Sequence, residues 1–266
     1  MIPKSGYRFS DKIMRKTIVR RAAFLALLLG LLPLGQATAA ELKVFGSRVT
    51  KIVVAELASE FERASGFTPV VVADVAQAMK RRIEADEPFD VAVLVNFQTD
   101  DLIKSGRLLA DSRADVMRSG IGVAVKRGAE KPDISTVDAF KRALLAAKSI
   151  TYLKEGASTI HLKKVFAELG LTDALAGKTV QPMTESVSEL VAAGEVELGI
   201  IVVPNILSVP GAELVGALPD EINSYVTFTA GVSATSPNRE AARALINLLT
   251  SPAAVAIIRA KGMEPV

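Results

Sequence analysis

The sequence predicts an α/β fold built from two successive units of alternating strands and helices, followed by a pair of helices. Two observations indicate this fold. Short apolar runs alternate with amphipathic segments along the chain after residue 40, which is the rhythm of strand–helix–strand units. The apolar runs are apolar throughout rather than at every second residue, which is typical of parallel strands that helices cover on both faces. Half of the 266 residues are hydrophobic and 23% are charged, so we expect a folded chain rather than disorder.

The first unit begins with a strand at Leu42–Phe45 and a helix that Thr50 caps. Val53, Leu57 and Phe61 recur on one face of that helix, and Gly66 stops it. Four further elements follow: a strand at 68–73, a helix at 77–85, a strand at 89–95 and a short helix at 100–105.

The second unit begins with a strand at 121–125, and a capping-box pattern at Ser135–Asp138 opens its first helix, to about residue 147. The remaining elements are a strand at 150–153, a helix from 159 to Gly170, a helix at 186–193, a strand at 198–203, a strand at 225–233 and two helices at 239–249 and 252–260. The two last helices are separated by Ser251-Pro252.

The first 40 residues carry the pattern of a secretory signal peptide. Basic residues up to Arg21 precede an apolar run from Ala22 to Leu34, and Ala37-Thr38-Ala39 gives a small-x-small cleavage site. The run is shorter than the roughly 20 residues that a membrane-spanning helix needs. We expect cleavage after Ala39 or Ala40 and export to the periplasm. The sequence leaves open whether translation starts at Met14. It also leaves open whether export uses the general secretory or the twin-arginine route.

The leader accounts for the positive net charge. Residues 1–40 hold seven of the 32 basic residues and one of the 29 acidic ones, so the rest of the chain has an acidic excess. A nucleic-acid-binding surface needs clustered basic residues, so we expect no nucleic-acid partner. The chain has no Cys and a single His, His161, and we therefore expect no disulfide and no metal site.

Several motifs in fixed order resemble the periplasmic molybdate-binding-like family of type 2 periplasmic solute-binding proteins. They are Val44-Phe45-Gly46-Ser47, the helix end Phe61-Glu62-Arg63-Ala64-Ser65-Gly66, the segment 82–91 (RIEADEPFDV), the segment 190–200 (LVAAGEVELGI) and the C-terminal segments 249–254 (LTSPAA) and 261–265 (KGMEP). The similarity covers residues 42–266.

This resemblance implies two lobes, each a mostly parallel sheet flanked by helices, with a ligand cleft between them. Lobe one would comprise residues 41–121 and 226–266, and lobe two residues 122–225, with the strands 121–125 and 225–233 as the hinge. The resemblance also implies a monomer without a cofactor that delivers a small anionic ligand to an inner-membrane ABC permease.

Four loops would face the cleft, because ligands of open α/β sheets bind at strand C-termini and helix N-termini. In these loops small, hydroxyl, amide and basic side chains suit an anion. Asp74, in the second loop, is expected to cap a helix. The candidate ligand-binding residues are Gly46, Ser47, Arg48, Lys51, Gln77, Asn96, Ala157, Ser158, Thr159 and Asn205.

The chain departs from the family at the molybdate ligands. Aligned on Phe45 and Phe61, Val49 stands where molybdate binders have a hydroxyl residue. Val75 and Ala76 replace the serines of the second loop, and Val202 replaces a tyrosine. A buried dianion would lose several charge-assisted hydrogen bonds, each worth about 1.5–3 kcal/mol. We therefore expect a small organic acid rather than molybdate.

Two alternative functions remain. The family includes aconitate isomerase, a periplasmic enzyme, so the cleft can host proton transfer on trans-aconitate. In that case His161, Glu155 or Asp74 would act as base and Arg48 or Lys51 as cation. The sensor domain of a cytoplasmic regulator can share the fold, but the signal peptide and the missing DNA-binding helix-turn-helix argue against it.

Overall fold

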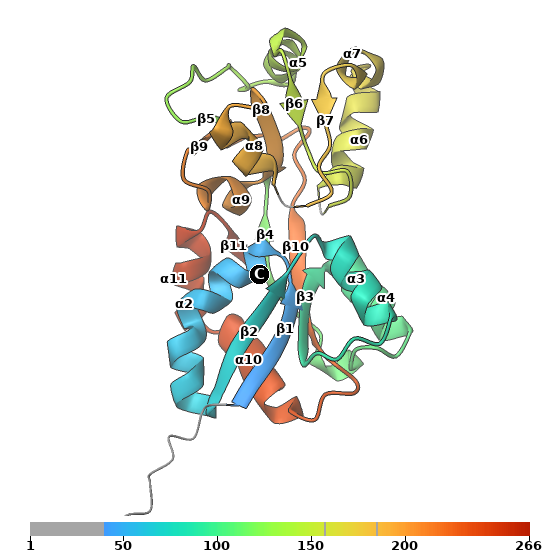
Figure 1. The fold of residues 1–266 in the computed structure, drawn as a ribbon, viewed down its shortest axis with the longest axis vertical. Helices are drawn as coiled ribbons and strands as arrows, with labels where there is room; N and C mark the ends of the chain where they lie inside the picture. The colour runs from blue at the N-terminus through green and yellow to red at the C-terminus, as the bar shows by residue number, and fades with distance from the viewer. Residues whose placement is uncertain (1–39, 157, 185) are drawn as a thin grey trace, which may run out of the picture. The chain divides into compact units, whose positions relative to one another are not determined.

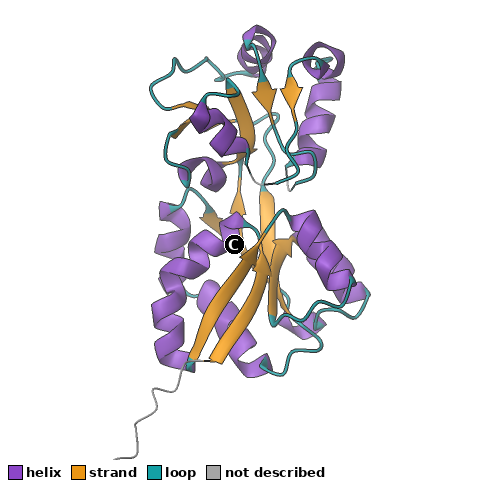
Figure 2. Ribbon diagram, viewed as in Figure 1, coloured by secondary structure: helices purple, strands orange, loops and turns teal. Residues whose placement is uncertain are grey.

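The computed structural model describes residues 40–156, 158–184 and 186–266, which belong to one compact unit (Figure 1). The predicted signal peptide therefore lies outside the described residues except for Ala40, which begins the first strand. The described chain forms two β-sheets with helices packed around them (Figure 2).

The first sheet has six strands in the order β11-β4-β10-β3-β1-β2. Strand β1 runs parallel to β2 and β3, whereas β10 is antiparallel to β3 and β4, and β11 is antiparallel to β4. The strands are β1 (Ala40–Gly46), β2 (Phe67–Ala73), β3 (Val91–Val95), β4 (Ala114–Ser119), β10 (Val226–Val232) and β11 (Glu264–Pro265).

The second sheet has five strands in the order β7-β6-β8-β5-β9. Strand β6 is parallel to β7 and β8, and β5 is antiparallel to β8 and β9. The strands are β5 (Ile121–Lys126), β6 (Ile150–Thr151), β7 (Thr179–Val180), β8 (Leu198–Val202) and β9 (Ala212–Ala217). The two-sheet α/β fold is confirmed. The expectation that each sheet is mostly parallel was wrong, because both sheets contain parallel and antiparallel pairs of strands.

The mixed character follows from the way the chain passes between the sheets. It leaves the first sheet after β4, enters the second through Gly120, and returns through residues 218–225 into β10. A strand that returns from the second sheet enters the first from the opposite end and runs antiparallel to β3. The chain passes between the two sheets at these two short connections. It does not do so along the strands 121–125 and 225–233, which we expected to form the hinge. The domain boundaries themselves stay a prediction.

Helices cover both faces of each sheet. In the first sheet, α2 and α11 lie on one side and α3 and α4 on the other (Figure 1). The helices around the first sheet are α2 (Arg48–Ser65), α3 (Ala76–Glu84), α4 (Asn96–Lys104), α10 (Arg239–Leu249) and α11 (Pro252–Ala260), with a 3₁₀ turn η1 (Ala110–Ser112). The second sheet carries α5 (Val137–Ala146), α6 (Thr159–Glu168), α7 (Thr172–Ala176), α8 (Val187–Ala193) and α9 (Val203–Leu207).

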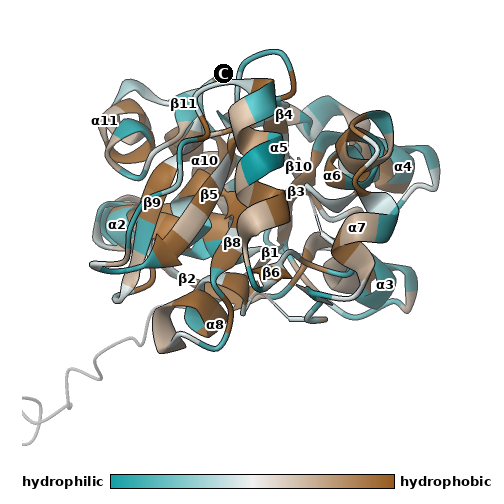
Figure 3. Cartoon of the chain, turned by 90° about the horizontal axis from the view of Figure 1, so that it is seen from above, coloured by the Kyte–Doolittle hydropathy of each residue, from teal (hydrophilic) through white to brown (hydrophobic). Residues whose placement is uncertain are grey.

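The cores follow the alternation of side chains along the strands. On β1, Leu42 and Val44 belong to the cluster that packs against α2, while Phe45 belongs to the cluster under α3 and α4. Figure 3 shows the apolar strands β5 and β8 inside and polar colour on outer helices such as α3 and α4. The continuous apolar runs therefore indicated correctly that strands are covered on both sides.

Two helix starts illustrate what the sequence predicted. The cap of α5 is confirmed, because Thr136 accepts a hydrogen bond from the backbone N–H of Ala139 at 3.1 Å. The cap at Thr50 was wrong, since α2 begins at Arg48 and Ser47 is its N-cap. The hydroxyl of Thr50 instead donates to the Val93 carbonyl on β3, at 3.3 Å.

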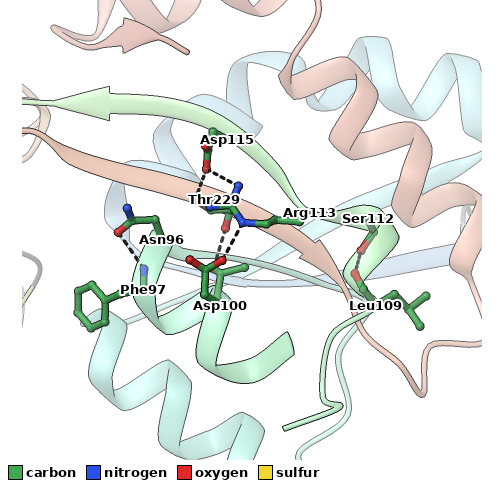
Figure 4. A network of polar contacts seen from close by, with 9 residues as sticks. Asn96, Phe97, Asp100, Leu109, Ser112, Arg113, Asp115 and Thr229 are labelled. Atoms are coloured by element: carbon green, nitrogen blue, oxygen red, sulfur yellow. Dashed lines mark hydrogen bonds and ion pairs between the residues drawn. The ribbon is translucent and has the colours of Figure 1, made fainter. Parts of the chain in front are cut away.

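Strands β4 and β9 were not predicted, because polar residues interrupt their apolar positions. Figure 4 shows how Asp115 of β4 is held. It accepts a hydrogen bond from the Thr229 hydroxyl on β10, at 2.5 Å, and pairs with Arg113, which also binds Asp100 of α4. These polar contacts hold the start of β4 against β10 and α4. Because the strand is held by polar contacts, the sequence contains no apolar run that would mark it.

Among the described residues, no single helix is long and apolar enough to cross a membrane. Helices α10 and α11 reach that length and composition only when taken together, and a bend of 61° separates them.

Candidate functional site

A small cavity of about 20 Å³ lies where loops of both sheets meet. The four predicted loops all contribute to its wall, together with one residue of β10. Its lining residues are Ser47, Val49, Val75, Ala76, Leu153, Gly156, Ser158, Ile201, Val202, Asn205 and Phe228. We call this space the central cavity.

Three polar side chains of the central cavity are almost fully buried. Ser47, Ser158 and Asn205 are 5%, 2% and 3% exposed, respectively. Among the residues that the structure describes, the Ser47 Oγ and the Asn205 Oδ1 have no hydrogen-bond partner. Buried polar atoms in folded proteins are nearly always paired, and each unpaired one costs about 1–3 kcal/mol. These two atoms therefore mark a place where a ligand or a water molecule supplies the missing partner.

The start of α2 adds backbone donors to this wall. Ser47 is the N-cap of the 18-residue helix, but its side chain makes no capping hydrogen bond, and the first turn contains no acidic residue. The N–H groups of a first helical turn lack intrahelical partners and carry a partial positive charge. Ser47 and the turn after it thus present unused donors suited to an anionic group.

The rest of the central cavity is apolar. Val49, Val75, Ala76 and Val202 all line it, so the positions that carry hydroxyl groups in molybdate binders do face this space. Water is poorly held against such a wall, and the few polar contacts present become stronger in the lower local dielectric. At about 20 Å³ the cavity has room for one small polar group such as a carboxylate, and the rest of a larger ligand would lie outside it.

A second, more open pocket adjoins α2 on the side of α8, with a volume of about 580 Å³. Arg48, Lys51 and Asp74 line it. The Arg48 Nη2 lies 2.5 Å from the Glu189 Oε1 on α8. The Asp74 Oδ1 accepts a hydrogen bond from the N–H of Val75, at 2.7 Å. Hydroxyl residues complete this wall, namely Thr184, Ser186 and Ser208.

A third pocket, with a volume of about 330 Å³, lies between the starts of α3, α4 and α6. Gln77 lines it and accepts a hydrogen bond from the Gln98 Nε2 at 3.1 Å. Thr159 also lines it, but its hydroxyl donates to the Leu153 carbonyl at 3.1 Å. The only proton of the Thr159 hydroxyl is thus committed to the backbone, which leaves that hydroxyl as an acceptor.

Three of the described sequence candidates, Gly46, Asn96 and His161, are not in these walls. The structure gives no description of Ala157. Asn96 accepts a hydrogen bond from the N–H of Phe97 at 2.8 Å (Figure 4). Gly46 serves packing, because a Cβ there would lie 2.6 Å from the Thr50 side chain. The His161 Nε2 lies 2.8 Å from the Ile222 carbonyl oxygen, in the connection between the sheets.

Several lining residues were missed by sequence reasoning. Arg81 reaches the third pocket from the expected helix 77–85, and Gln98 and Lys154 reach it from positions just outside the expected elements. Phe228 reaches the central cavity from the middle of β10. No local pattern distinguishes an inward side chain of a strand from one that faces a cavity, so only the arrangement of the strands could identify Phe228. In the part of the chain that the structure describes, no group of three His, Cys, Asp or Glu side chains is placed to hold a metal ion.

The family of bacterial extracellular solute-binding proteins matches residues 42–264 of the chain. The protein belongs to this family. It is 35% identical over 219 residues to an aconitate isomerase from a Pseudomonas species, a match that covers 80% of this chain and 83% of that protein. It is 26% identical over 236 residues to the molybdate-binding protein ModA of Azotobacter vinelandii, covering 85% and 90%.

Solved structures of solute-binding proteins have the same fold. The periplasmic molybdate-binding protein of Azotobacter vinelandii matches with a TM-score of 0.71 and 19% identity, covering 84% of this chain and 98% of that one. The sulfate-binding protein SubI of Mycobacterium tuberculosis H37Rv also matches with a TM-score of 0.71, at 14% identity, covering 85% and 87%. This solute-binding protein thus has the type 2 periplasmic binding fold that its motifs predicted.

Proposed function

We propose that this solute-binding protein is a periplasmic enzyme that binds a small polycarboxylate, with one carboxylate in the central cavity, and interconverts trans- and cis-aconitate. The proposal reverses the order of the two sequence-based hypotheses, in which an importer receptor came first. The relative that is 35% identical over most of both chains is an aconitate isomerase. The observation that carries the proposal is the central cavity, where Ser47, Ser158 and Asn205 are buried in an apolar wall.

The reaction makes two demands on such a site. A base removes a proton from the methylene carbon of trans-aconitate, the double bond shifts by one position, and the proton returns at the former vinyl carbon, so that nothing is gained or lost. The intermediate spreads negative charge onto a neighbouring carboxylate. The Ser47 hydroxyl and the first-turn amides of α2 are suited to hold that carboxylate, because fixed donors at the site of developing charge lower the barrier.

Two carboxylates flank the central cavity and are candidates for the base. Asp74 immediately precedes Val75, and Glu155 immediately precedes Gly156, both of which line the cavity. Asp74 lines the second pocket near Lys51, and Glu155 lines the third pocket. His161 is a weaker candidate, because one of its ring nitrogens lies against the Ile222 carbonyl and it lines none of the three spaces.

The decisive experiment mixes the purified protein with trans-aconitate and follows the cis isomer by chromatography or proton NMR. Turnover that Asp74→Asn or Glu155→Gln reduces by about 100-fold or more, within the usual range for general-base catalysis, supports the proposal and identifies the base. Solvent deuterium in the methylene group of recovered substrate would report the proton removal directly. Stoichiometric binding without any cis product contradicts the enzymatic proposal.

The second candidate function is a receptor that passes an organic acid to an inner-membrane ABC permease. It is favoured by the family and by the resemblance to ModA of Azotobacter vinelandii. Calorimetric titration with molybdate and with trans-aconitate distinguishes the ligands. Tight molybdate binding without carboxylate binding would reject the organic acid in both functions. N-terminal sequencing of the exported protein tests cleavage after Ala39 or Ala40.

A further inference from the structure

The third pocket adjoins the central cavity. Ala76 and Gly156 line both spaces, whereas the second pocket shares no lining residue with the central cavity. A ligand with one carboxylate at Ser47 and Ser158 would therefore have its remaining groups next to the starts of α3, α4 and α6.

The third pocket contains a buried polar atom without a partner. Gln98 is 3% exposed, and its Nε2 donates to the Gln77 Oε1 at 3.1 Å. The Gln98 Oε1 has no hydrogen-bond partner within the protein. Rotation of such an amide exchanges its oxygen and nitrogen positions, so the pair can present either a donor or an acceptor to a ligand.

The charges around the third pocket favour an anion. Arg81, Lys154, Lys163 and Glu155 line it. The Arg81 Nη1 lies 2.9 Å from the Glu155 Oε2, so these two charges compensate each other. In the described part of the chain neither Lys154 nor Lys163 has an ion-pair partner, which leaves a surplus of two positive charges at the pocket. The second pocket is less suitable, because Asp74 lines it and Arg48 pairs with Glu189.

Apolar groups frame the same space. Phe97, at the start of α4, and Ile160, at the start of α6, are exposed large side chains, and both line the third pocket. They come from helices of different sheets. Their position next to the lysines suits a ligand arm that carries a carboxylate at the end of a carbon frame.

We propose that the third pocket is a second carboxylate subsite, in which Lys154, Lys163 and the Gln77–Gln98 pair select polycarboxylates over monocarboxylates. This inference rests on the proposed function, because it assumes that the central cavity holds the first carboxylate. It assigns to these residues a role in ligand selection and none in the proton transfer.

The test compares trans-aconitate with crotonate, which has one carboxylate on a similar unsaturated frame. Calorimetric titration of the wild-type protein is expected to give at least tenfold tighter binding of trans-aconitate. Lys163→Glu is expected to weaken trans-aconitate binding by about tenfold through charge reversal, and to change crotonate binding less than twofold.

Lys164→Glu is the matched control. Lys164 is the next residue on α6, is exposed, pairs only with Glu168 and lines none of the pockets described above. It undergoes the same change of charge, so a general electrostatic effect would weaken binding equally in both variants. We expect Lys164→Glu to bind both acids as the wild type does. Gln98→Leu provides a second probe, with weaker trans-aconitate binding and no loss of thermal stability.

Equal effects of the two charge reversals, or equal loss of both acids in Lys163→Glu, overturn the subsite. A wild-type protein that binds both acids equally, or neither of them, also overturns it. Assaying the same samples for cis-aconitate separates this inference from the enzymatic proposal, because selective binding without turnover retains the subsite and rejects the isomerase.

Discussion

Arg81 of α3 and Glu155 of the loop before α6 form an ion pair between helices of the first sheet and a loop of the second, with Nη1 2.9 Å from Oε2. Arg48 of α2 and Glu189 of α8 form another, at 2.5 Å. In both pairs the cation belongs to the first sheet's layer and the acid to the second. The Arg81–Glu155 pair lines the third pocket, and Arg48 of the other pair lines the second pocket. Each pair therefore connects a helix of the first sheet to an element of the second, beside the central cavity.

We expect the Arg81–Glu155 pair to contribute little to stability. Both side chains are substantially exposed, and exposed ion pairs are typically worth about 0–1 kcal/mol. A double-mutant cycle with Arg81→Ala and Glu155→Ala, measured by urea denaturation, is expected to give a coupling of at most about 1 kcal/mol. A coupling above about 2 kcal/mol would contradict the expectation that solvent screens this ion pair.

Gly46→Ala is expected to destabilise the protein by about 1–3 kcal/mol, as overpacking does. A Cβ at residue 46 would lie 2.6 Å from both Cβ and Oγ1 of Thr50, a β-branched residue held by its hydrogen bond to Val93. Gly177→Ala is the matched control, because nothing lies within 4 Å of a Cβ there and its φ is −74°. Equilibrium unfolding should give the control a stability equal to or above the wild type.

The pH dependence of stability should contain a contribution from Glu87. Its hydrogen bonds with Arg82 and Lys43 lower the pKa of this carboxyl to about 2. A depressed folded-state pKa stabilises the native protein above the unfolded pKa, and this stabilisation is lost as the pH falls through the folded value. Glu87→Gln should therefore be less stable than the wild type at pH 7, with the difference shrinking between about pH 4.5 and 2. Unfolding curves at several pH values measure it, and a constant difference would reject the assignment.

Asn205→Leu should separate ligand binding from folding. The Asn205 Oδ1 is buried without a protein partner, so an apolar side chain of similar size costs little stability. We expect an unchanged or higher melting temperature together with at least tenfold weaker binding of trans-aconitate, which calorimetry would measure.

Ser112→Ala is the opposite control. The Ser112 hydroxyl donates to the Leu109 carbonyl (Figure 4) and accepts from the N–H of Val232, away from the cavity. This variant should lose about 1–3 kcal/mol of stability and bind the ligand normally. If Asn205→Leu instead unfolded like Ser112→Ala and bound normally, Asn205 would be a structural residue.

Much of the candidate site could be predicted because strand ends are visible in the sequence. Ser47, Ser158 and Asn205 each follow or adjoin a predicted strand, and the rule that ligands bind at strand C-termini brought them together in advance. Asn96 obeys the same rule, yet it is hydrogen-bonded to the N–H of Phe97. The rule identifies the edge of a sheet and not the direction of each side chain along it.

The sequence by itself determined most of the longer strands and helices, though not β4 and β9, since continuous apolar runs and amphipathic periods report burial directly. It also determined the family, through motifs spread over the whole of residues 42–266. The tertiary structure decided the direction of β10, because a strand's orientation depends on the end from which the chain returns. It also decided that the loops line three spaces, and that the Gln77–Gln98 pair and the two lysines face one of them. Such groupings depend on contacts between residues far apart in the chain, which no local pattern records.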